Sequence, residues 1–473
     1  MSAQREETQL AIIGAGPGGY AAAFMAADLG LEVALIDPEA DPGGVCLFRG
    51  CIPSKALLHA AAVIGAARSA ADMGIDFDAP RVDIDKLRGW KDGVVRKLTR
   101  GLGQLAKRRR VRFIRGRARF AGERELELEA EDGPARLAFD RAILATGSRP
   151  ATIPGLPADS ERVLDSAAAL ELAQLPERLL VVGGGYIGLE LGTVYARLGS
   201  RVTLVEMTSS LLPGVDADLV RPLAKELRAL FSAIHLETEL TELEDTGTAL
   251  RAELAGAGGE GDGGQEFDRV LVAVGRRPNS AELGLDRAGV EVDERGFVPV
   301  DEQLRTSAAA IQAIGDVTGQ PMLAHRASHQ GRIAAEVCAG RQVVHQPRAV
   351  PAVVFTQPEI AWCGPTEAEA DRAGRDLEPV RFPWAASGRA ATMDAPAGQT
   401  KLLVDPSSGR VVGAGLVGAG AGELIAEAVL AIEMGATPED LALAIHPHPT
   451  LSETWMEAAA AFNGTATHIY KPR

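Results

Sequence analysis

The chain has 473 residues, of which 46% are hydrophobic and 24% are charged, and its net charge is −15. This length suits about three domains of a globular protein, and the acidic balance argues against a nucleic-acid-binding protein, which needs a basic face. The basic run at 107–110 is interpreted as a solvated face. Residues 1–9 lack the pattern of a signal or transit peptide. The sequence has no run of about 18 uncharged apolar residues, so no membrane span is expected. We therefore expect a cytoplasmic protein.

The first predicted unit is a strand at 10–13, a Gly-rich turn, an Ala-rich helix to Leu29, and a second strand at 32–36 that ends at Asp37. In the turn, Gly14 permits a tight bend, Gly16 lets the backbone approach a pyrophosphate, and Gly19 lets the helix pack on the sheet. The pyrophosphate would lie at the helix N-terminus. We expect Asp37 to bind ribose hydroxyls, so the unit predicts a dinucleotide site.

Cys46 and Cys51 lie in the segment GGVCLFRGCIPSK at 43–55. They can close a small disulfide loop at the start of a helix, where the pKa of a thiolate falls and redox chemistry is favoured. Lys55 lies one turn beyond Cys51, so its charge can support a thiolate or a reduced flavin. The alternatives are half of a metal site, for which only His59 is nearby as a further ligand, and a coincidental buried pair.

A second unit repeats the first: a strand at 179–182, a turn with Gly183, Gly185 and Gly188, and a strand at 201–205 followed by Glu206. A carboxylate at Glu206 repels a 2′-phosphate, which favours NAD over NADP. The alternative for both units is a purely structural Gly turn.

Segments 141–150 and 269–278 share a third pattern, an apolar strand that runs into a Gly turn and a proline. They place boundaries near 150 and 275, and we predict domains at 1–150, 151–275, 276–349 and 350–473. The Gly-rich stretch 256–264 predicts a hairpin loop. Helices predicted at 423–434 and 450–462 suit either a dimer interface or an ordinary core. Cys338 and Cys363 are isolated in apolar surroundings and are expected to be buried.

The segment HPHPTLSE at 446–453 contains His446, His448 and Glu453. A dithiol substrate loses protons as it is oxidised, and histidine titrates in the appropriate range. Glu453 could orient one imidazole through a hydrogen bond. A structural turn is the alternative, but the cysteine pair favours catalysis, with His448 ahead of His446. Two nucleotide sites and a redox disulfide together imply a flavin between a nicotinamide and a thiol couple.

From Ile12 to Glu457 the chain resembles the pyridine nucleotide–disulfide oxidoreductases, most closely those that oxidise dihydrolipoamide. The motifs that carry the resemblance are GGVCLFRGCIPSK, GGGYIGLE, AIGDV and HPHPTLSE. It implies an α/β fold with two Rossmann-like dinucleotide-binding domains, for FAD and NAD, and a C-terminal α+β dimerisation domain. No metal is implied. The implied FAD residues are Gly14, Gly16, Gly19, Asp37, Lys55, Thr146, Gly147 and Asp316, and the implied NAD residues are Gly183, Gly185, Gly188, Glu206 and Gly275.

The resemblance also implies roles at the redox centre. Cys46 would meet the substrate and Cys51 the flavin, while Lys55 would pair with Glu190. His448, held by Glu453, would act on the disulfide of a partner subunit, which requires a homodimer. The implied partner is a lipoyl-bearing protein of a 2-oxoacid dehydrogenase or glycine cleavage type complex.

Two alternatives to this function remain: an NADH-dependent reductase of another small disulfide, such as that of glutathione or coenzyme A, and a structural FAD-holding subunit. The chain lacks the C-terminal cysteine pair of mercuric reductases. Arg49, between the two cysteines, and His329 depart from the commoner family pattern. Their effect on potential or substrate choice is not predicted.

Overall fold

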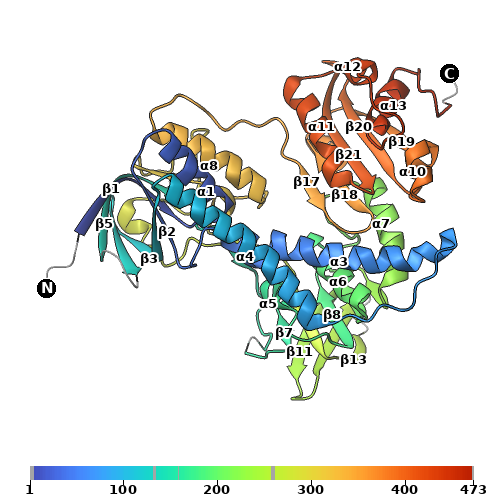
Figure 1. The fold of residues 1–473 in the computed structure, drawn as a ribbon, viewed down its shortest axis with the longest axis horizontal. Coiled ribbons are helices and arrows are strands. Elements are labelled where there is room, and N and C mark those ends of the chain that lie inside the picture. Colours follow the sequence, from blue (N-terminus) through green and yellow to red (C-terminus); the bar gives the residue numbers. More distant parts are fainter. Residues whose placement is uncertain (1–4, 131–134, 158, 257–260, 471–473) are drawn as a thin grey trace.

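The computed structural model describes residues 5–130, 135–157, 159–256 and 261–470. The described residues form three main sheets with helices packed on them, two that are wholly or mostly parallel and one that is antiparallel, together with two smaller antiparallel sheets (Figure 1). This arrangement confirms the expected α/β class with an α+β C-terminal part.

The first sheet is built around β1 (Arg5–Ile13), which lies between β2 (Val33–Asp37) and β5 (Arg136–Leu144) in parallel pairing. β3 (Arg112–Gly122) joins β2, and β4 (Glu125–Ala130) runs antiparallel to β3 and β5. β1 is longer than the strand predicted at 10–13, because Arg5–Thr8 pairs with the N-terminal part of β5. That long-range pairing has no signal in local hydrophobic periodicity.

The segment after residue 275 returns to this first sheet. Its strand β16 (Ile311–Ala313) pairs with β5, and its helix α8 (Ala324–Cys338) packs along α1 (Pro17–Asp28). The 3-10 helix η2 (Asp286–Ala288) precedes β16, and the 3-10 helix η3 (Gly315–Thr318) lies between β16 and α8. The strand–turn–helix–strand unit at the start of the chain is therefore completed by residues far along the chain.

The second parallel sheet has the order β10-β9-β8-β14-β7. Its strands are β7 (Val163–Leu164), β8 (Arg178–Val182), β9 (Arg201–Val205), β10 (Ala233–His235) and β14 (Arg269–Val272), and its helices are α5 (Ser166–Glu171), α6 (Tyr186–Leu198) and α7 (Ala217–Leu230). An antiparallel extension contains β11 (Thr238–Asp245), β12 (Leu250–Gly256) and β13 (Gly261–Phe267). The hairpin loop predicted at 256–264 is too long, because Gly256 ends β12 and residues 261–264 belong to β13, whose backbone pairs with β12. Residues 257–260 lie outside the described part of the chain.

The chain passes between the two parallel sheets along β6 (Ser148–Pro150) and β15 (Arg276–Pro278), which pair antiparallel. These strands belong to the two segments that share a Gly–Pro pattern. Their pairing brings the ends of β5 and β14 together, beside the opening between the sheets.

The third sheet is antiparallel, in the order β17-β18-β21-β20-β19. Its strands are β17 (Ala352–Val354), β18 (Glu359–Cys363), β19 (Glu378–Pro383), β20 (Gln399–Asp405) and β21 (Arg410–Gly418). The C-terminal helices are α9 (Glu367–Arg372), η4 (Trp384–Ala386), α10 (Gly388–Thr392), α11 (Ala421–Met434), α12 (Pro438–Leu443) and α13 (Glu453–Phe462). Trp384 and Trp455 are fully buried in the core of this part, and Cys338 and Cys363 are buried as expected.

Two long helices connect the sheets. The short helix α2 (Gly44–Arg49) leads into α3 (Cys51–Ser69) and η1 (Ala70–Met73), and α4 (Ile84–Arg108) runs beside α3 (Figure 1). The stretch Gly44–Met73 is long and apolar enough to cross a membrane by length and composition alone, which the sequence analysis did not anticipate. Its apolar residues Leu57, Leu58 and Ile64 are buried in a core shared with α6. Packing inside the protein accounts for their apolar character.

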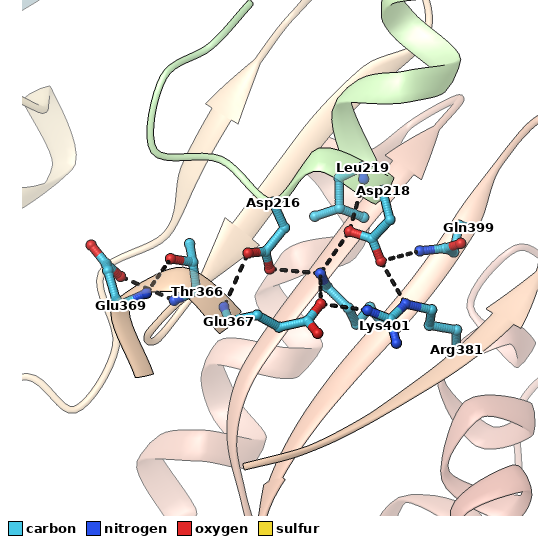
Figure 2. Close-up of polar contacts among 9 residues, drawn as sticks. All are labelled: Asp216, Asp218, Leu219, Thr366, Glu367, Glu369, Arg381, Gln399 and Lys401. Atoms are coloured by element: carbon cyan, nitrogen blue, oxygen red, sulfur yellow. Dashed lines mark hydrogen bonds and ion pairs between the residues drawn. The ribbon is translucent and has the colours of Figure 1, made fainter. Parts of the chain in front are cut away.

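A buried ion-pair cluster joins α7 to the C-terminal sheet. The Lys401 ammonium, 1% exposed, contacts Asp216, Asp218 and Glu367 at 2.6, 2.8 and 2.7 Å (Figure 2). Arg381 bridges Asp218 and Glu367 beside it. These carboxylates have the spacing of a possible metal site, but Lys401 occupies the position between them. We call this group the Lys401 cluster.

Candidate active site

A cavity of about 740 Å³ opens between the two parallel sheets. Its walls come from the first Gly turn, the cysteine-bearing helices α2 and α3, η3 and the start of α6. The predicted site residues in its lining are Gly14, Gly16, Asp37, Cys46, Cys51, Lys55, Thr146, Gly147, Glu190 and Asp316. Gly19, Gly183, Gly185, Gly188, Glu206, Gly275, His448 and Glu453 lie outside it.

The first Gly turn has the shape that a pyrophosphate requires. Gly14 has a φ of +100°, and a Cβ added there would lie 2.3 Å from the Ala145 carbonyl oxygen. A Cβ at Gly19 would lie 1.8 Å from the Gly14 carbonyl oxygen, so helix and turn pack too closely for a side chain. At Gly16 the nearest atom would be 3.9 Å away, which leaves the backbone accessible from the cavity. The residues present therefore fit the diphosphate of FAD.

The carboxylate of Asp37 closes this turn. The Ala15 N–H donates to Asp37 Oδ2 at 2.7 Å, and the Glu39 N–H donates to Oδ1 at 3.0 Å. Burial raises the pKa of Asp37, while the hydrogen bond from Ala15 opposes that rise. The side chain thus stands between the turn and the cavity, where a ribose hydroxyl could bind it.

The second Gly turn repeats this geometry on the other parallel sheet. Gly183 has a φ of +110°, a Cβ at Gly188 would lie 2.1 Å from the Gly183 carbonyl oxygen, and a Cβ at Gly185 would meet nothing within 4 Å. The Gly184 N–H donates to Glu206 Oε2 at 2.7 Å, and the Thr208 N–H donates to Oε1 at 2.8 Å. These residues fit a second dinucleotide without a 2′-phosphate.

The two cysteines meet where α2 ends and α3 begins. Gly50 joins the helices, and a Cβ there would lie 2.8 Å from the Val45 carbonyl oxygen, so only glycine allows the junction. In the structure both cysteines are free thiols. A hydrogen bond from the Cys46 thiol lowers the pKa of Cys51 to about 7, against the effect of burial and with help from Lys55. The same hydrogen bond and burial raise the pKa of Cys46.

Lys55 and Glu190 form an ion pair beside these thiols. Lys55 Nζ lies 2.8 Å from Glu190 Oε2, and the Glu190 side chain is 4% exposed. Lys55 comes from α3 and Glu190 from α6, so the contact forms where the two parallel sheets meet. The pair places the Lys55 cation next to Cys51, and the Glu190 carboxylate balances that positive charge on the far side of Lys55.

A hydrogen-bonded network lies where the paired strands β6 and β15 border the cavity, and it consists of Asp316, Ser148 and Arg276. The Ser148 hydroxyl donates to Asp316 Oδ2 at 2.5 Å, and Arg276 Nε donates to the Ser148 hydroxyl oxygen at 2.7 Å. Ser148 and Arg276 were not among the predicted site residues. Each directly follows the glycine of one of the two matching segments, 141–150 and 269–278, and this shared position could have identified them from the sequence.

His448 and Glu453 form a dyad in the C-terminal part. His448 Nδ1 lies 2.9 Å from Glu453 Oε1, and the Thr450 N–H donates to Glu453 Oε2 at 2.8 Å. Burial alone would raise the pKa of Glu453, but the hydrogen bonds from Thr450 and His448 outweigh this effect and lower the pKa. The His448 side chain is 73% exposed and does not reach the cavity of its own chain. His446 is instead buried against Glu427, at 2.7 Å.

The two departures from the family pattern lie in different places. Arg49 lines the cavity and forms an ion pair with Glu39, so its guanidinium points toward the Asp37 side and not between the thiols. His329, on α8, lies outside the cavity lining, and its Nδ1 is 3.1 Å from that of His345.

Comparisons with known proteins agree with this geometry. Residues 8–331 match the pyridine nucleotide-disulphide oxidoreductase family, and residues 350–459 match its dimerisation domain. Dihydrolipoyl dehydrogenase from Vibrio cholerae is 46% identical over 463 residues, which cover 98% of this chain and 97% of that protein. Dihydrolipoyl dehydrogenase from Thermus scotoductus is 47% identical over 464 residues, 97% of this chain and 98% of that protein.

Solved structures show the same fold. LpdA from Mycobacterium tuberculosis superposes with a TM-score of 0.89 at 28% identity, covering 96% of this chain and 99% of that chain. The HOCl-induced flavoprotein disulfide reductase RclA from Escherichia coli has a TM-score of 0.84 at 29% identity, with the same coverage of both chains.

Proposed function

Because the chain belongs to the pyridine nucleotide-disulphide oxidoreductase family, we propose that it is a dihydrolipoyl dehydrogenase. It oxidises dihydrolipoamide carried by another protein and passes the electrons through the Cys46–Cys51 couple and FAD to NAD⁺. The observation that carries the proposal is the position of Cys46 and Cys51 in a cavity whose walls also hold the first Gly turn and Lys55.

The cofactors are assigned to the two Gly turns. FAD is held by Gly14, Gly16, Gly19, Asp37, Lys55, Thr146, Gly147 and Asp316, and NAD by Gly183, Gly185, Gly188, Glu206 and Gly275. When bound, the flavin supplies two-electron transfer between the thiol couple and the nicotinamide. The open space over Gly16 and Gly185 supports this assignment, as does the carboxylate at the end of β2 and after β9.

The thiols have unequal roles in the proposed reaction. His448 of the partner subunit accepts a proton from one substrate thiol, and the resulting thiolate attacks Cys46 Sγ. The Cys46–Cys51 disulfide breaks, and Cys51 leaves as a thiolate. The second substrate thiol then attacks the substrate sulfur bonded to Cys46, closes the substrate disulfide and leaves Cys46 protonated. Two electrons thus pass to the cysteine pair, and the two protons reside on His448 and Cys46.

The electrostatics of the pair support this division. Lys55 favours the Cys51 thiolate, which makes Cys51 the better leaving group while Cys46 becomes bonded to the substrate sulfur. Once the substrate disulfide has closed, the hydrogen bond from the Cys46 thiol keeps the pKa of Cys51 low, at about 7. The raised pKa of Cys46 keeps that sulfur protonated after turnover. Glu190 holds Lys55 in place, and Glu453 orients the imidazole of His448.

The active unit is a homodimer, for which the dimerisation domain at 350–459 is the basis. Leu430, Met434, Leu443 and Ile445 are between 63% and 99% exposed and lie near His448 in the sequence. Contact between two such faces would bury this apolar surface and bring His448 toward the partner's thiols. We assign dinucleotide binding to 1–150, 151–275 and 276–349 and dimerisation to 350–473. The proposed partner is a lipoyl-bearing protein of a 2-oxoacid dehydrogenase or glycine cleavage type complex, and the proposed location of the chain is the cytoplasm.

The test is NADH formation from dihydrolipoamide and NAD⁺ by the purified protein and by Cys46→Ser. We expect turnover by the wild type and none by the variant. Specificity constants for lipoamide, glutathione disulfide and coenzyme A disulfide, each with NADH and NADPH, identify the substrate class. Normal turnover by Cys46→Ser would contradict the mechanism, and a preference for glutathione or coenzyme A disulfide would instead identify a small-disulfide reductase.

A further inference from the structure

Lys55 has a second contact besides Glu190. Its ammonium lies over the ring of Phe355, 4.5 Å from the ring centroid. A cation over an aromatic face is attracted by the ring quadrupole, and the attraction grows where water is partly excluded. Phe355 directly follows β17, so the C-terminal part of the same chain supplies this ring to Lys55, a residue that lines the cavity between the two parallel sheets.

Phe355 also contacts the other member of the ion pair. Its backbone N–H donates to Glu190 Oε1 at 3.0 Å, while Glu190 Oε2 accepts from Lys55 at 2.8 Å. One residue therefore holds both Lys55 and Glu190, through its ring and its backbone respectively. The backbone donor is kept in every substitution except proline, so the role of the ring can be tested separately.

The position of Lys55 matters because of the charges around Cys51. The titratable groups near this thiol are Cys46 on α2, Lys55 on α3 itself, Glu190 and Tyr186 on α6, and Tyr20 on α1. Lys55 is the cation of this set, whereas Glu190 disfavours a thiolate. A displacement of the ammonium toward solvent would leave the thiolate facing Glu190 without compensation.

We propose that Phe355 is a positioning residue of the redox site, whose ring keeps the Lys55 ammonium beside Cys51. Lys55 has a long, flexible side chain that is 32% exposed, and Glu190 alone restrains only one of its donors. The ring covers the ammonium from a second direction, which reduces the conformations open to it. The C-terminal part of the chain thereby sets the charge next to the thiolate.

This inference rests on the proposed role of Cys51 as the flavin-facing thiolate, and not on the identity of the disulfide substrate. The competing explanation is that the ring only fills space, because Phe355 also packs against the core shared by α3 and α6. A leucine would largely satisfy that packing role but could not attract the ammonium.

The experiment compares Phe355→Leu with Phe355→Tyr in the FAD-loaded dimer. The matched control is Phe24→Leu, which removes another partly buried ring whose centroid lies 5.0 Å from a cation, the guanidinium of Arg109. Arg109, unlike Lys55, does not line the cavity. Each protein is reduced anaerobically with dithiothreitol. The long-wavelength thiolate–flavin absorption and the rate of Cys51 alkylation by iodoacetamide are then followed against pH. FAD content and melting temperature check the fold, and Phe355→Met replaces the leucine variant if that variant loses FAD.

We expect the pH midpoint of both signals to rise by about half a unit to one unit in Phe355→Leu. We expect it to stay at the wild-type value in Phe355→Tyr and Phe24→Leu. An unchanged midpoint in Phe355→Leu, or an equal shift in the tyrosine variant, would overturn the proposal. The readouts need no lipoyl substrate, so a protein inactive toward dihydrolipoamide that still shows the shift would refute the proposed function and leave this inference standing.

Discussion

The separation of His448 from the thiols of its own chain leads to a quantitative prediction about mixed dimers. In one chain, Cys46 lines the cavity, whereas the His448 side chain is 73% exposed and contacts Glu453 through Nδ1. In a twofold-symmetric dimer the two sites are equivalent, so each site would combine the thiols of one chain with the histidine of the other. A heterodimer of a Cys46→Ser chain and a His448→Gln chain then has one site with both defects and one intact site.

Such a heterodimer should therefore show about half of the wild-type turnover number per dimer. Each variant homodimer has a defect in both sites, and loss of the general base lowers activity by about 10²- to 10⁴-fold. If His448 instead served the thiols of its own chain, both sites of the heterodimer would be defective. The two arrangements differ by at least about 50-fold on this basis.

The assay uses co-expression of the two chains with different affinity tags and sequential purification on both tags. Dihydrolipoamide-dependent NADH formation is measured at once, with the two variant homodimers and a doubly tagged wild-type dimer as controls. Activity of the heterodimer at the level of the His448→Gln homodimer would refute the reasoning. It would mean that the C-terminal part folds back onto its own cavity during turnover.

Four further outcomes are expected. The thiolate–flavin absorption of the reduced enzyme should rise through a pH near the pKa of about 7 for Cys51 and be lost below it, because the Cys46 hydrogen bond and Lys55 favour the thiolate; a midpoint near that of a free thiol would contradict the site's electrostatics. Lys401→Met should reduce the free energy of unfolding by about 3 kcal/mol or more near neutral pH, as measured by urea denaturation, since it leaves three carboxylates without their buried cation. In the wild type, burial raises the pKa of Asp218, but Lys401 and Arg381 outweigh this effect and lower the pKa to about 2. The resulting contribution of Asp218 to the free energy of unfolding is present above the unfolded pKa of about 3.9 and is lost as the pH falls through about 2. Glu206→Gln should raise the KM for NAD⁺ about tenfold while affecting NADP⁺ less, in steady-state kinetics, because a charged ribose acceptor is lost. Arg49→Leu breaks a half-exposed ion pair with Glu39, so the unfolding free energy should change by less than about 1 kcal/mol and the thiolate–flavin absorption should persist; loss of that absorption would place Arg49 at the thiols.

The parts of the site that lie within one short stretch of chain were predictable. Gly14 to Asp37 forms a strand, a turn, a helix and a strand in sequence, so backbone sterics at the glycines and the helix N-terminus determine its shape locally. The same holds for the repeat from Gly183 to Glu206, for the helix start at Cys51, and for the family resemblance that these motifs carry. Local rules were less reliable at element ends, as the early start of β1 shows.

The contacts that join distant segments were not predictable from residue patterns. Lys55 and Glu190 are 135 positions apart, and the Phe355 N–H reaches Glu190 across 165 positions. The family resemblance implied the first of these contacts but not the second. The Ser148–Asp316 contact and the Lys401–Asp216 contact likewise join distant segments, 168 and 185 positions apart.

The sequence by itself determined the two Gly turns, the cysteine pair and the histidine dyad, because each depends on neighbouring residues and on backbone conformation. Only the tertiary structure decided what surrounds the thiols: the Arg49 guanidinium turns away toward Glu39, and the ring of Phe355 covers Lys55. The physical reason is that packing between sheets depends on the complementary shapes and charges of whole surfaces, which no local spacing encodes.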